Sequence, residues 1–161
     1  VASKSKHSTL AEYGATPIDY RTQDFVEVIR LAEPQGLHAV FDGMGGEHFK
    51  HSYALLQRGG KLVGYGNPLS AAGMLKFFGQ LILFNLLPDG RSAAPYSTGI
   101  SWLSWRPFLE DWEILFKLLE EGKIDPVIAA RFPILEAAKA NALLESGQVV
   151  GNIVLLAPEL L

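Results

Sequence analysis

The chain has 161 residues, with 14 Lys or Arg against 17 Asp or Glu, and a formal net charge of −3. Hydrophobic residues make up 48% and charged residues 19%, which excludes a disordered chain and suffices for one domain with a core. The small excess of acidic over basic residues argues against nucleic-acid binding. The absence of Cys excludes disulfides, Cys-ligated zinc and thiol catalysis. We expect a cytoplasmic location. The sequence begins Val1-Ala2-Ser3 without Met, so we expect a processed N-terminus or a piece of a longer protein.

The first half of the chain alternates short apolar runs with helical patterns. We expect the end of a helix over 6–14, an extended piece over 16–20, and a helix over 25–32 that is capped by Thr22 or Asp24. After these we expect a strand over 37–41, a helix over 48–56 and a strand over 61–65. Arg58-Gly59-Gly60 is expected to terminate the helix over 48–56. The run 37–41 is almost continuously apolar, which is typical of a strand buried on both faces of a parallel sheet. The alternation predicts parallel βαβ units in an α/β fold.

The second half is less regular. Residues 69–87 are strongly apolar and are interpreted as a helix packed at a domain or subunit interface, with a marginal membrane span as the alternative. In chain order we then expect a turn over 88–91, a loop or strand over 92–106, a helix over 108–121, an extended segment over 127–132, a helix over 135–144 and a strand over 151–156.

Two glycine-rich segments follow predicted strands, at 42–46 and 65–68. Ligands of parallel α/β sheets bind at the carboxyl ends of strands, and glycine there lets the backbone approach a flat ligand. Simple turn glycines explain the pattern equally well.

Several polar residues invite chemical hypotheses. Cations and hydroxyls near the start, with Tyr20, could hold a phosphate, although a solvated charged face is the simpler reading; they are Ser3, Lys4, Lys6 and Arg21. His48 and His51 lack further ligands for a metal and are expected on an exposed helix surface. Asp42 is a candidate acid or a turn cap, and no Ser–His–Asp arrangement can be argued from spacing.

Five segments together resemble the medium-chain dehydrogenase/reductase superfamily, and within it the zinc-independent, quinone oxidoreductase-like branch. They are residues 2–7, 10–21, 40–46, 56–66 and 143–155, which cover nearly the whole chain in order. The resemblance implies a Rossmann-type, doubly wound parallel sheet and NADP(H)-dependent hydride transfer to quinones or enones.

The resemblance also implies cofactor contacts. Ser3, Lys6 and Tyr20 stand where the family contacts the ribose 2′-phosphate, and the lack of an acidic residue over 3–6 agrees with NADP(H). The other implied cofactor-binding residues are Gly43, Tyr65, Gly66, Asn67, Tyr96, Ser97 and Asn152, the last replacing the usual Lys. No catalytic residue and no metal ligand is implied.

The chain departs from the family pattern because the first Rossmann strand and its glycine-rich loop are absent. We therefore expect an incomplete dinucleotide-binding domain over 1–122, a segment over 123–161 that returns to a catalytic domain, and an unpaired edge on the strand over 37–41.

The functional expectation is the C-terminal, cofactor-binding part of an NADPH-dependent quinone or enone reductase. We expect this chain alone to be inactive and to bind no cofactor, and expect the protein to form a homodimer through residues 92–100. Its partner would be a small quinone or carbonyl substrate, with neither nucleic acid nor membrane involved. The alternative is a non-catalytic member of the family that acts as a membrane- or protein-associated binding module.

Overall fold

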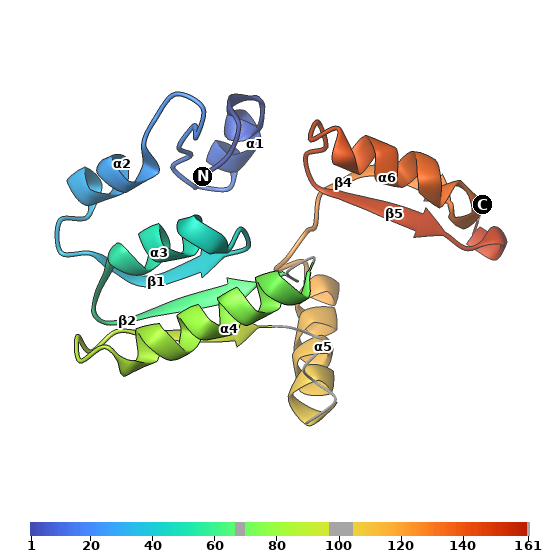
Figure 1. Cartoon of the computed structure of the whole chain (residues 1–161). Coiled ribbons are helices and arrows are strands. Elements are labelled where there is room, and N and C mark those ends of the chain that lie inside the picture. Colours follow the sequence, from blue (N-terminus) through green and yellow to red (C-terminus); the bar gives the residue numbers. More distant parts are fainter. Residues whose placement is uncertain (67–69, 97–104, 161) are drawn as a thin grey trace. The chain divides into compact units, whose positions relative to one another are not determined.

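A computed structural model of the chain describes residues 1–66, 70–96 and 105–160. It has an α/β fold with parallel sheets, as the alternation of strands and helices predicted (Figure 1). The internal contacts divide the chain into two units: Thr22–Phe108, and a second unit that joins Val1–Arg21 with Leu109–Leu161. The domain boundary at residue 122 stays a prediction.

The unit Thr22–Phe108 holds a three-stranded parallel sheet in the order β1-β2-β3. Its elements are α2 (Phe25–Ala32), β1 (Leu37–Asp42), α3 (Gly46–Ala54), β2 (Leu56–Tyr65), α4 (Ala71–Leu86) and β3 (Ser92–Tyr96). Of the two predicted caps, Asp24 starts α2, because its carboxylate accepts a hydrogen bond from the Val26 N–H at 2.8 Å. The hydroxyl of Ser70 caps α4 in the same way through the Gly73 N–H.

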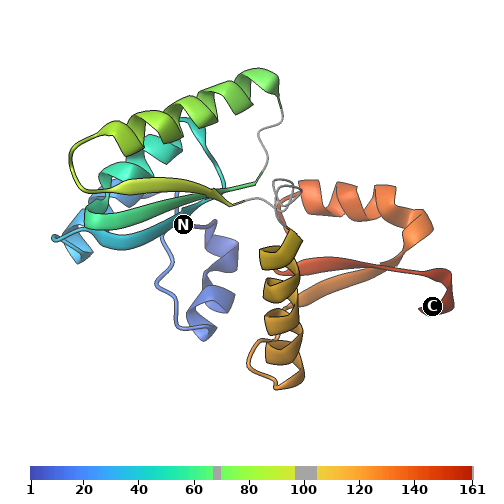
Figure 2. The ribbon, with the colours of Figure 1, turned by 90° about the horizontal axis from the view of Figure 1, so that it is seen from below.

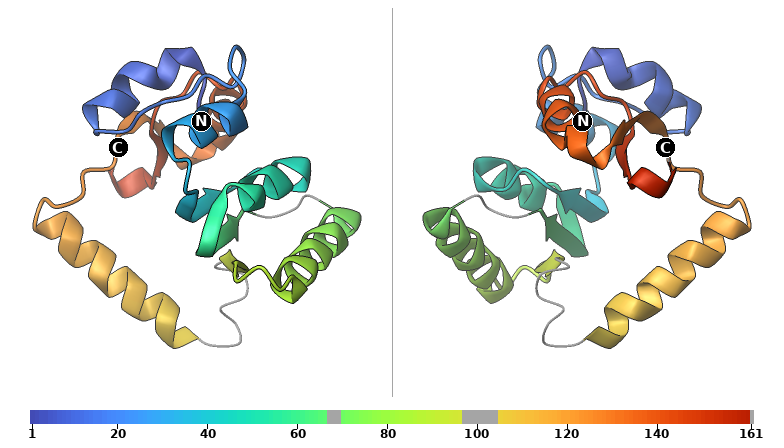
Figure 3. Two further views of the ribbon diagram at one scale, coloured as in Figure 1. Left: turned by 90° about the vertical axis from the view of Figure 1, so that its left-hand side faces the viewer. Right: turned by 90° about the vertical axis from the view of Figure 1, so that its right-hand side faces the viewer.

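Helices α3 and α4 lie on the same face of this sheet, as the views from below and from the side show (Figures 2 and 3). Phe49 of α3 and Leu62 of β2 are completely buried at the centre of the core between them. The remaining buried members of the core are Tyr53, Leu56, Leu81, Phe84 and Ala93. Gly64 lets α4 pack closely on the sheet, because a Cβ there would lie 2.7 Å from the Phe77 ring.

The expectation that the strand over 37–41 is buried on both faces is wrong for this unit. Phe41 is 71% exposed, and Ala39, two positions earlier on the same face of the strand, is exposed as well. The physical reason is that α3 and α4 cover one face only, so side chains that alternate to the other face of β1 meet no helix of this unit.

The end of the helix before β2 also differs from the prediction. Helix α3 ends at Ala54, and Arg58-Gly59-Gly60 lie inside β2 rather than terminating the helix. The register shifts there, because Leu37 pairs with Leu56 while Ala39 pairs with Lys61. Glycine is required at this bulge, since a Cβ on Gly60 would lie 2.7 Å from the Leu37 carbonyl oxygen.

The second unit contains a two-stranded parallel sheet with α6 packed on it (Figure 1). Its elements are the 3₁₀ turn Lys4–Lys6, α1 (His7–Glu12), α5 (Trp105–Glu120, which begins in the other unit), β4 (Ile128–Pro133), a 3₁₀ turn over Ile134–Glu136, α6 (Ala137–Glu145), β5 (Asn152–Leu156) and a 3₁₀ turn over Pro158–Leu160. Ala2 forms an isolated parallel bridge with Asp19, and its N–H donates to the Ile18 carbonyl at 2.9 Å.

Helix α4 confirms the helix predicted within 69–87. Its inward residues include buried Leu81 and Phe84, whereas Leu75, Ile82 and Leu86 are 77%, 63% and 75% exposed. Among the described residues, no helix combines the length and the apolarity needed to cross a bilayer.

Candidate functional site

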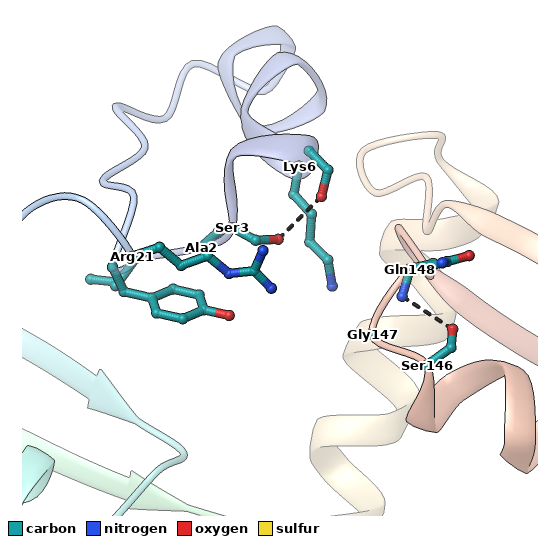
Figure 4. Close-up of a pocket in the computed structure, with 10 residues that line it drawn as sticks. Ala2, Ser3, Lys6, Arg21, Ser146, Gly147 and Gln148 are labelled. Carbon is teal, nitrogen blue, oxygen red and sulfur yellow. Dashed lines mark hydrogen bonds between the residues drawn. The ribbon is translucent and has the colours of Figure 1, made fainter.

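Two cavities contain most of the residues that the sequence singled out, and each lies within one unit. The first, which we call the N-terminal cavity, has a volume of about 680 Å³. It is lined by Val1, Ala2, Ser3, Ser5, Lys6, Tyr20, Arg21, Ser146, Gly147 and Gln148 (Figure 4). It therefore brings together the three residues that were predicted to contact a ribose 2′-phosphate.

Local structure explains how the N-terminal side chains reach this cavity. Ser3 precedes a tight turn in which the Lys6 N–H donates to the Ser3 carbonyl at 2.9 Å, so both side chains emerge from the same turn. Tyr20 and Arg21 directly follow the bridge residue Asp19. The buried Asp19 carboxylate accepts a hydrogen bond from the Arg21 N–H at 3.1 Å, which fixes the backbone at that point.

The lining of the N-terminal cavity is cationic and hydroxylic. Lys6 and Arg21 extend into it, and none of its lining residues is acidic (Figure 4). The Ser3 and Ser5 hydroxyls lie 3.2 Å apart, and the Arg21 guanidinium lies 5.7 Å from the centre of the Tyr20 ring. Cations with hydroxyl donors are the groups that bind phosphate in proteins.

Sequence reasoning missed the far wall of this cavity, formed by residues 146–148. These residues follow α6, where Gly147 has a φ of +70° and the Gln148 N–H donates to the Ser146 hydroxyl at 3.3 Å. The glycine marked a turn, and the segment was part of the family resemblance. However, no local signal links it to residues more than a hundred positions earlier.

The second cavity, which we call the strand-end cavity, has a volume of about 210 Å³. Its lining residues come from the carboxyl ends of β1 and β2, from the glycine loop that follows β1, and from α4. Figure 1 shows where these elements lie. Its lining residues are Asp42, Gly43, Met44, Gly45, Gly46, Tyr65, Gly66, Gly73, Lys76, Phe77 and Gln80. It brings together the predicted residues Gly43, Tyr65 and Gly66. The Tyr65 ring lies so close to Gly43 that a Cβ at that position would be only 2.9 Å from it.

Asp42 organises the glycine loop beside this cavity. Its Oδ1 accepts hydrogen bonds from the N–H groups of Met44 and Gly45, at 2.8 and 3.0 Å. Its Oδ2 accepts from the Ser52 hydroxyl at 2.6 Å and lies 2.8 Å from Nδ1 of His48. Burial raises the pKa of this carboxyl, but these hydrogen bonds outweigh burial and hold the pKa below its usual value.

The cluster of Asp42, His48 and Ser52 is not arranged as a nucleophilic triad. The Ser52 hydroxyl and Nδ1 of His48 both bond to the same oxygen of Asp42, so the imidazole does not lie between the carboxylate and the hydroxyl as it does in a triad. His48 is not the free surface histidine that was expected: its side chain is 32% exposed, bonds to Asp42 and stacks on Phe25 at 4.6 Å. The spacing of His48 and Ser52, one helical turn apart, is the signal that could have placed both toward Asp42.

Of the remaining predicted residues, Tyr96 and Asn152 are described and line neither cavity. Tyr96 pairs in register with Tyr65 and is 57% exposed. Asn152 begins β5 and its N–H donates to the Val127 carbonyl at 2.7 Å. Asn67 and Ser97 lie outside the described residues. The cofactor roles of all ten residues stay predictions.

No metal site is found in the part of the chain that the structure describes. No three His, Cys, Asp or Glu side chains come together there in a way that could hold an ion.

The model of the family described as "Zinc-binding dehydrogenase" matches residues 13–155. The chain belongs to this family. The resemblance to the quinone oxidoreductase-like branch of the medium-chain dehydrogenases/reductases is thereby confirmed. The description of the family mentions zinc, but the sequence has no Cys, and among the described residues no three His, Asp or Glu side chains come together as zinc ligands, so the residues present do not fit a zinc site.

Individual relatives are longer than this chain. The "Synaptic vesicle membrane protein VAT-1 homolog" of Danio rerio is 30% identical over 165 residues, which cover 96% of this chain and 34% of that protein. The structure of the quinone oxidoreductase from Coxiella burnetii is 27% identical with a TM-score of 0.67, covering 94% of this chain and 42% of the other. A mycobacterial protein complexed with NADPH shares the fold, at 22% identity and a TM-score of 0.68, over 96% of this chain and 47% of the other. The chain thus spans about a third to a half of the length of these relatives.

Proposed function

We propose that the chain is the cofactor-binding part of an NADPH-dependent oxidoreductase that transfers hydride to a quinone or an enone-like carbonyl compound. The observation that carries the proposal is the N-terminal cavity, in which Ser3, Lys6 and Tyr20 gather without an acidic neighbour in the lining. A ribose without a 2′-phosphate is usually held by an acidic residue, whereas a 2′-phosphate needs cations. The coenzyme, when bound, supplies the hydride.

The residues of this chain would bind and orient the coenzyme rather than take part in proton transfer. Lys6 and Arg21 offer charge-assisted hydrogen bonds to a phosphate, and the hydroxyls of Ser3 and Tyr20 offer neutral ones. The glycine loop 43–46, held by Asp42, offers a wall without side chains to a flat ring. Such orientation is the contribution expected of a protein whose coenzyme carries the chemistry.

The test is a titration of the complete protein that carries this chain with NADPH and NADH, followed by coenzyme fluorescence. Lys6→Glu should weaken NADPH binding roughly 10- to 100-fold, because one charge-assisted hydrogen bond is lost and a repulsion is added. NADH binding should change little. Lys4→Glu is the matched control, since Lys4 is exposed and lies outside the lining. Equal affinity for both coenzymes, with no effect of Lys6→Glu, would refute the phosphate assignment.

A second candidate function is a membrane-associated binding module without catalysis. The observation that favours it is the row of exposed apolar side chains on α4, which includes Leu75, Ile82 and Leu86. Co-sedimentation of the complete protein with liposomes tests it. Binding that Leu75→Lys and Ile82→Lys abolish would support the module, and a protein that stays in the supernatant would exclude it.

A further inference from the structure

The N-terminal cavity has a hydroxyl in its lining that the proposed coenzyme contacts do not use. Ser5 is exposed, lines the cavity and is the middle residue of the 3₁₀ turn Lys4–Lys6. Its Oγ lies 3.2 Å from the Oγ of Ser3. A group attached to the Ser5 hydroxyl is therefore carried on a side chain that borders the cavity, while the hydroxyl itself is open to an enzyme from solvent.

Two cations in the same lining lack an anionic partner. Within the described ranges, none of the ion pairs includes Lys6 or Arg21. The acidic residue nearest to Arg21 in the sequence, Asp19, is 6% exposed and lies outside the lining, where its carboxylate accepts a hydrogen bond from the Arg21 backbone N–H. The ammonium of Lys6 and the guanidinium of Arg21 are therefore available to an anion in the cavity.

A phosphate on Ser5 supplies such an anion from within the chain. A phosphoserine carries about −1.5 to −2 charges at neutral pH and three acceptor oxygens, which suit the forked donors of Arg and the ammonium of Lys. Ser5 also lies between Lys4 and Lys6 in the sequence, and the charge pattern around a serine is what protein kinases use to select it.

We propose that Ser5 is a phosphorylation site whose phosphate binds Lys6 and Arg21 inside the N-terminal cavity. In the modification, the Ser5 Oγ attacks the γ-phosphorus of a nucleoside triphosphate. The new Oγ–P bond forms as the bond from that phosphorus to the β–γ bridging oxygen breaks, and a nucleoside diphosphate leaves. A carboxylate of a separate protein kinase takes the hydroxyl proton.

The consequence for the coenzyme rests on the proposed function. There, the 2′-phosphate of NADPH binds through Ser3, Lys6 and Tyr20. A phosphate on Ser5 occupies the same cation and repels a second phosphate, so it blocks NADPH. NADH has no 2′-phosphate and loses little. Phosphorylation of Ser5 is thus a switch that acts on one of the two coenzymes.

Access of a kinase to Ser5 is tested with the unmodified complete protein, MgATP and a kinase that selects serines beside basic residues. Mass spectrometry should find the phosphate on Ser5, and Ser5→Ala should remove it. A protein that gains no phosphate at Ser5 would overturn its assignment as a modification site.

Binding of the phosphate by the two cations is tested without any coenzyme, on the complete protein with phosphoserine incorporated at position 5. Phosphorus NMR follows the second ionisation, whose pKa is about 6 in a free phosphoserine. This pKa should be lower at Ser5, because the cations stabilise the dianion, and Lys6→Gln or Arg21→Gln should raise it again. Phosphoserine at position 8 is the matched control, since Ser8 is exposed on α1 but does not line the cavity. Identical titrations at both positions would overturn the proposal.

The effect on the coenzyme is measured by titrating the same phosphorylated proteins with NADPH and NADH. Phosphate on Ser5 should weaken NADPH binding roughly 10- to 100-fold and NADH binding little, whereas phosphate on Ser8 should change neither. If Lys6→Glu weakens NADPH binding and phosphate on Ser5 does not, the proposed function survives and the switch fails. If the cations hold the phosphate but neither change affects NADPH, the phosphorylation site stands and the proposed function fails.

Discussion

Asp42 is 3% exposed and is the acceptor for two backbone N–H groups and the Ser52 hydroxyl, with His48 beside it. Asp42→Asn should therefore destabilise the fold by about 1–3 kcal/mol, because an amide nitrogen replaces an acceptor oxygen that faces donors. Urea unfolding at neutral pH measures this loss. Asp24→Asn is the control, since Asn also caps helices well and Asp24 lies on the surface.

The same residue predicts a pH dependence. The pKa of Asp42 is lower in the folded chain than in the unfolded chain, where it is about 4. The stabilisation from its ionised form is therefore complete above about pH 4 and is lost as the pH falls through the folded-state pKa. The free energy of unfolding of Asp42→Asn should fall less steeply below pH 4 than that of the unaltered chain. Parallel slopes for the two proteins in acid would contradict this account of Asp42.

The sequence groups residues that lie near one another in the chain, but it does not group residues that only folding brings together. Ser3, Lys6 and Tyr20 lie within the first 20 positions, and the turn and bridge that unite them are local. Residues 146–148 reach the same cavity from another segment, and Gln80 reaches Gly46 across 34 positions. Such contacts depend on tertiary packing, which no short-range pattern encodes.

At the scale of the element, the packing of α4 on the sheet predicts opposite effects of adding a methyl group at two glycines. Gly64 lies in the contact between the helix and the sheet, whereas Gly79 faces open space. A Cβ on Gly64 would lie 2.7 Å from the Phe77 ring and 2.9 Å from the Phe49 ring, whereas nothing lies within 4 Å of a Cβ on Gly79. Gly64→Ala should cost about 1–3 kcal/mol through overpacking. Gly79→Ala should stabilise by about 0.5–1 kcal/mol, because glycine in a helix interior loses more backbone entropy. Thermal unfolding of the two variants measures the contrast, and equal effects would show that α4 does not pack as described.

Asn85 joins the end of α4 to β3. Its Nδ2 donates to the Ala93 carbonyl at 2.7 Å and its Oδ1 accepts from the Ala93 N–H at 3.1 Å, so the side chain pairs with the strand as a backbone would. Asn85→Leu should cost about 1–3 kcal/mol, since both Ala93 groups lose their partner. Hydrogen exchange at Ala93 gives a specific measurement, because it should accelerate more in Asn85→Leu than in Gly64→Ala at matched stability.

The elements themselves were largely predictable, and the errors have a common cause. Asp24, Pro34 and the apolar periodicity located α2, and a run of apolar residues located β1. The bulge in β2 was missed, because Arg58-Gly59-Gly60 is a typical helix terminator and only the pairing with β1 shows otherwise. The exposed face of β1 was missed for a similar reason, because the sequence of a strand does not reveal which of its faces a helix will cover.

At the scale of the whole molecule, the two edge strands of the three-stranded sheet, β1 and β3, differ in how many backbone N–H and C=O groups are free to pair with a strand of another chain. Strand β3 was predicted to extend the sheet of a partner, through residues 92–100, of which 97–100 lie outside the described residues. Within 92–96, both backbone groups of Ala93 are taken by Asn85, and Pro95 has no N–H. Strand β1 pairs with β2 and with no other strand among the described residues. We therefore expect self-association through β1 rather than through β3.

Self-association of the 161-residue chain can be followed by sedimentation velocity from micromolar to millimolar concentrations. Phe41→Lys should reduce it strongly, because a charge on an exposed strand edge opposes pairing and Phe41 is 71% exposed, so its loss costs little packing. Leu31→Lys is the matched control: Leu31 is 86% exposed but belongs to α2 and not to β1. If both variants reduce association equally, general surface apolarity drives it. If the unaltered chain stays monomeric throughout the range, the free edge of β1 is not an interaction surface.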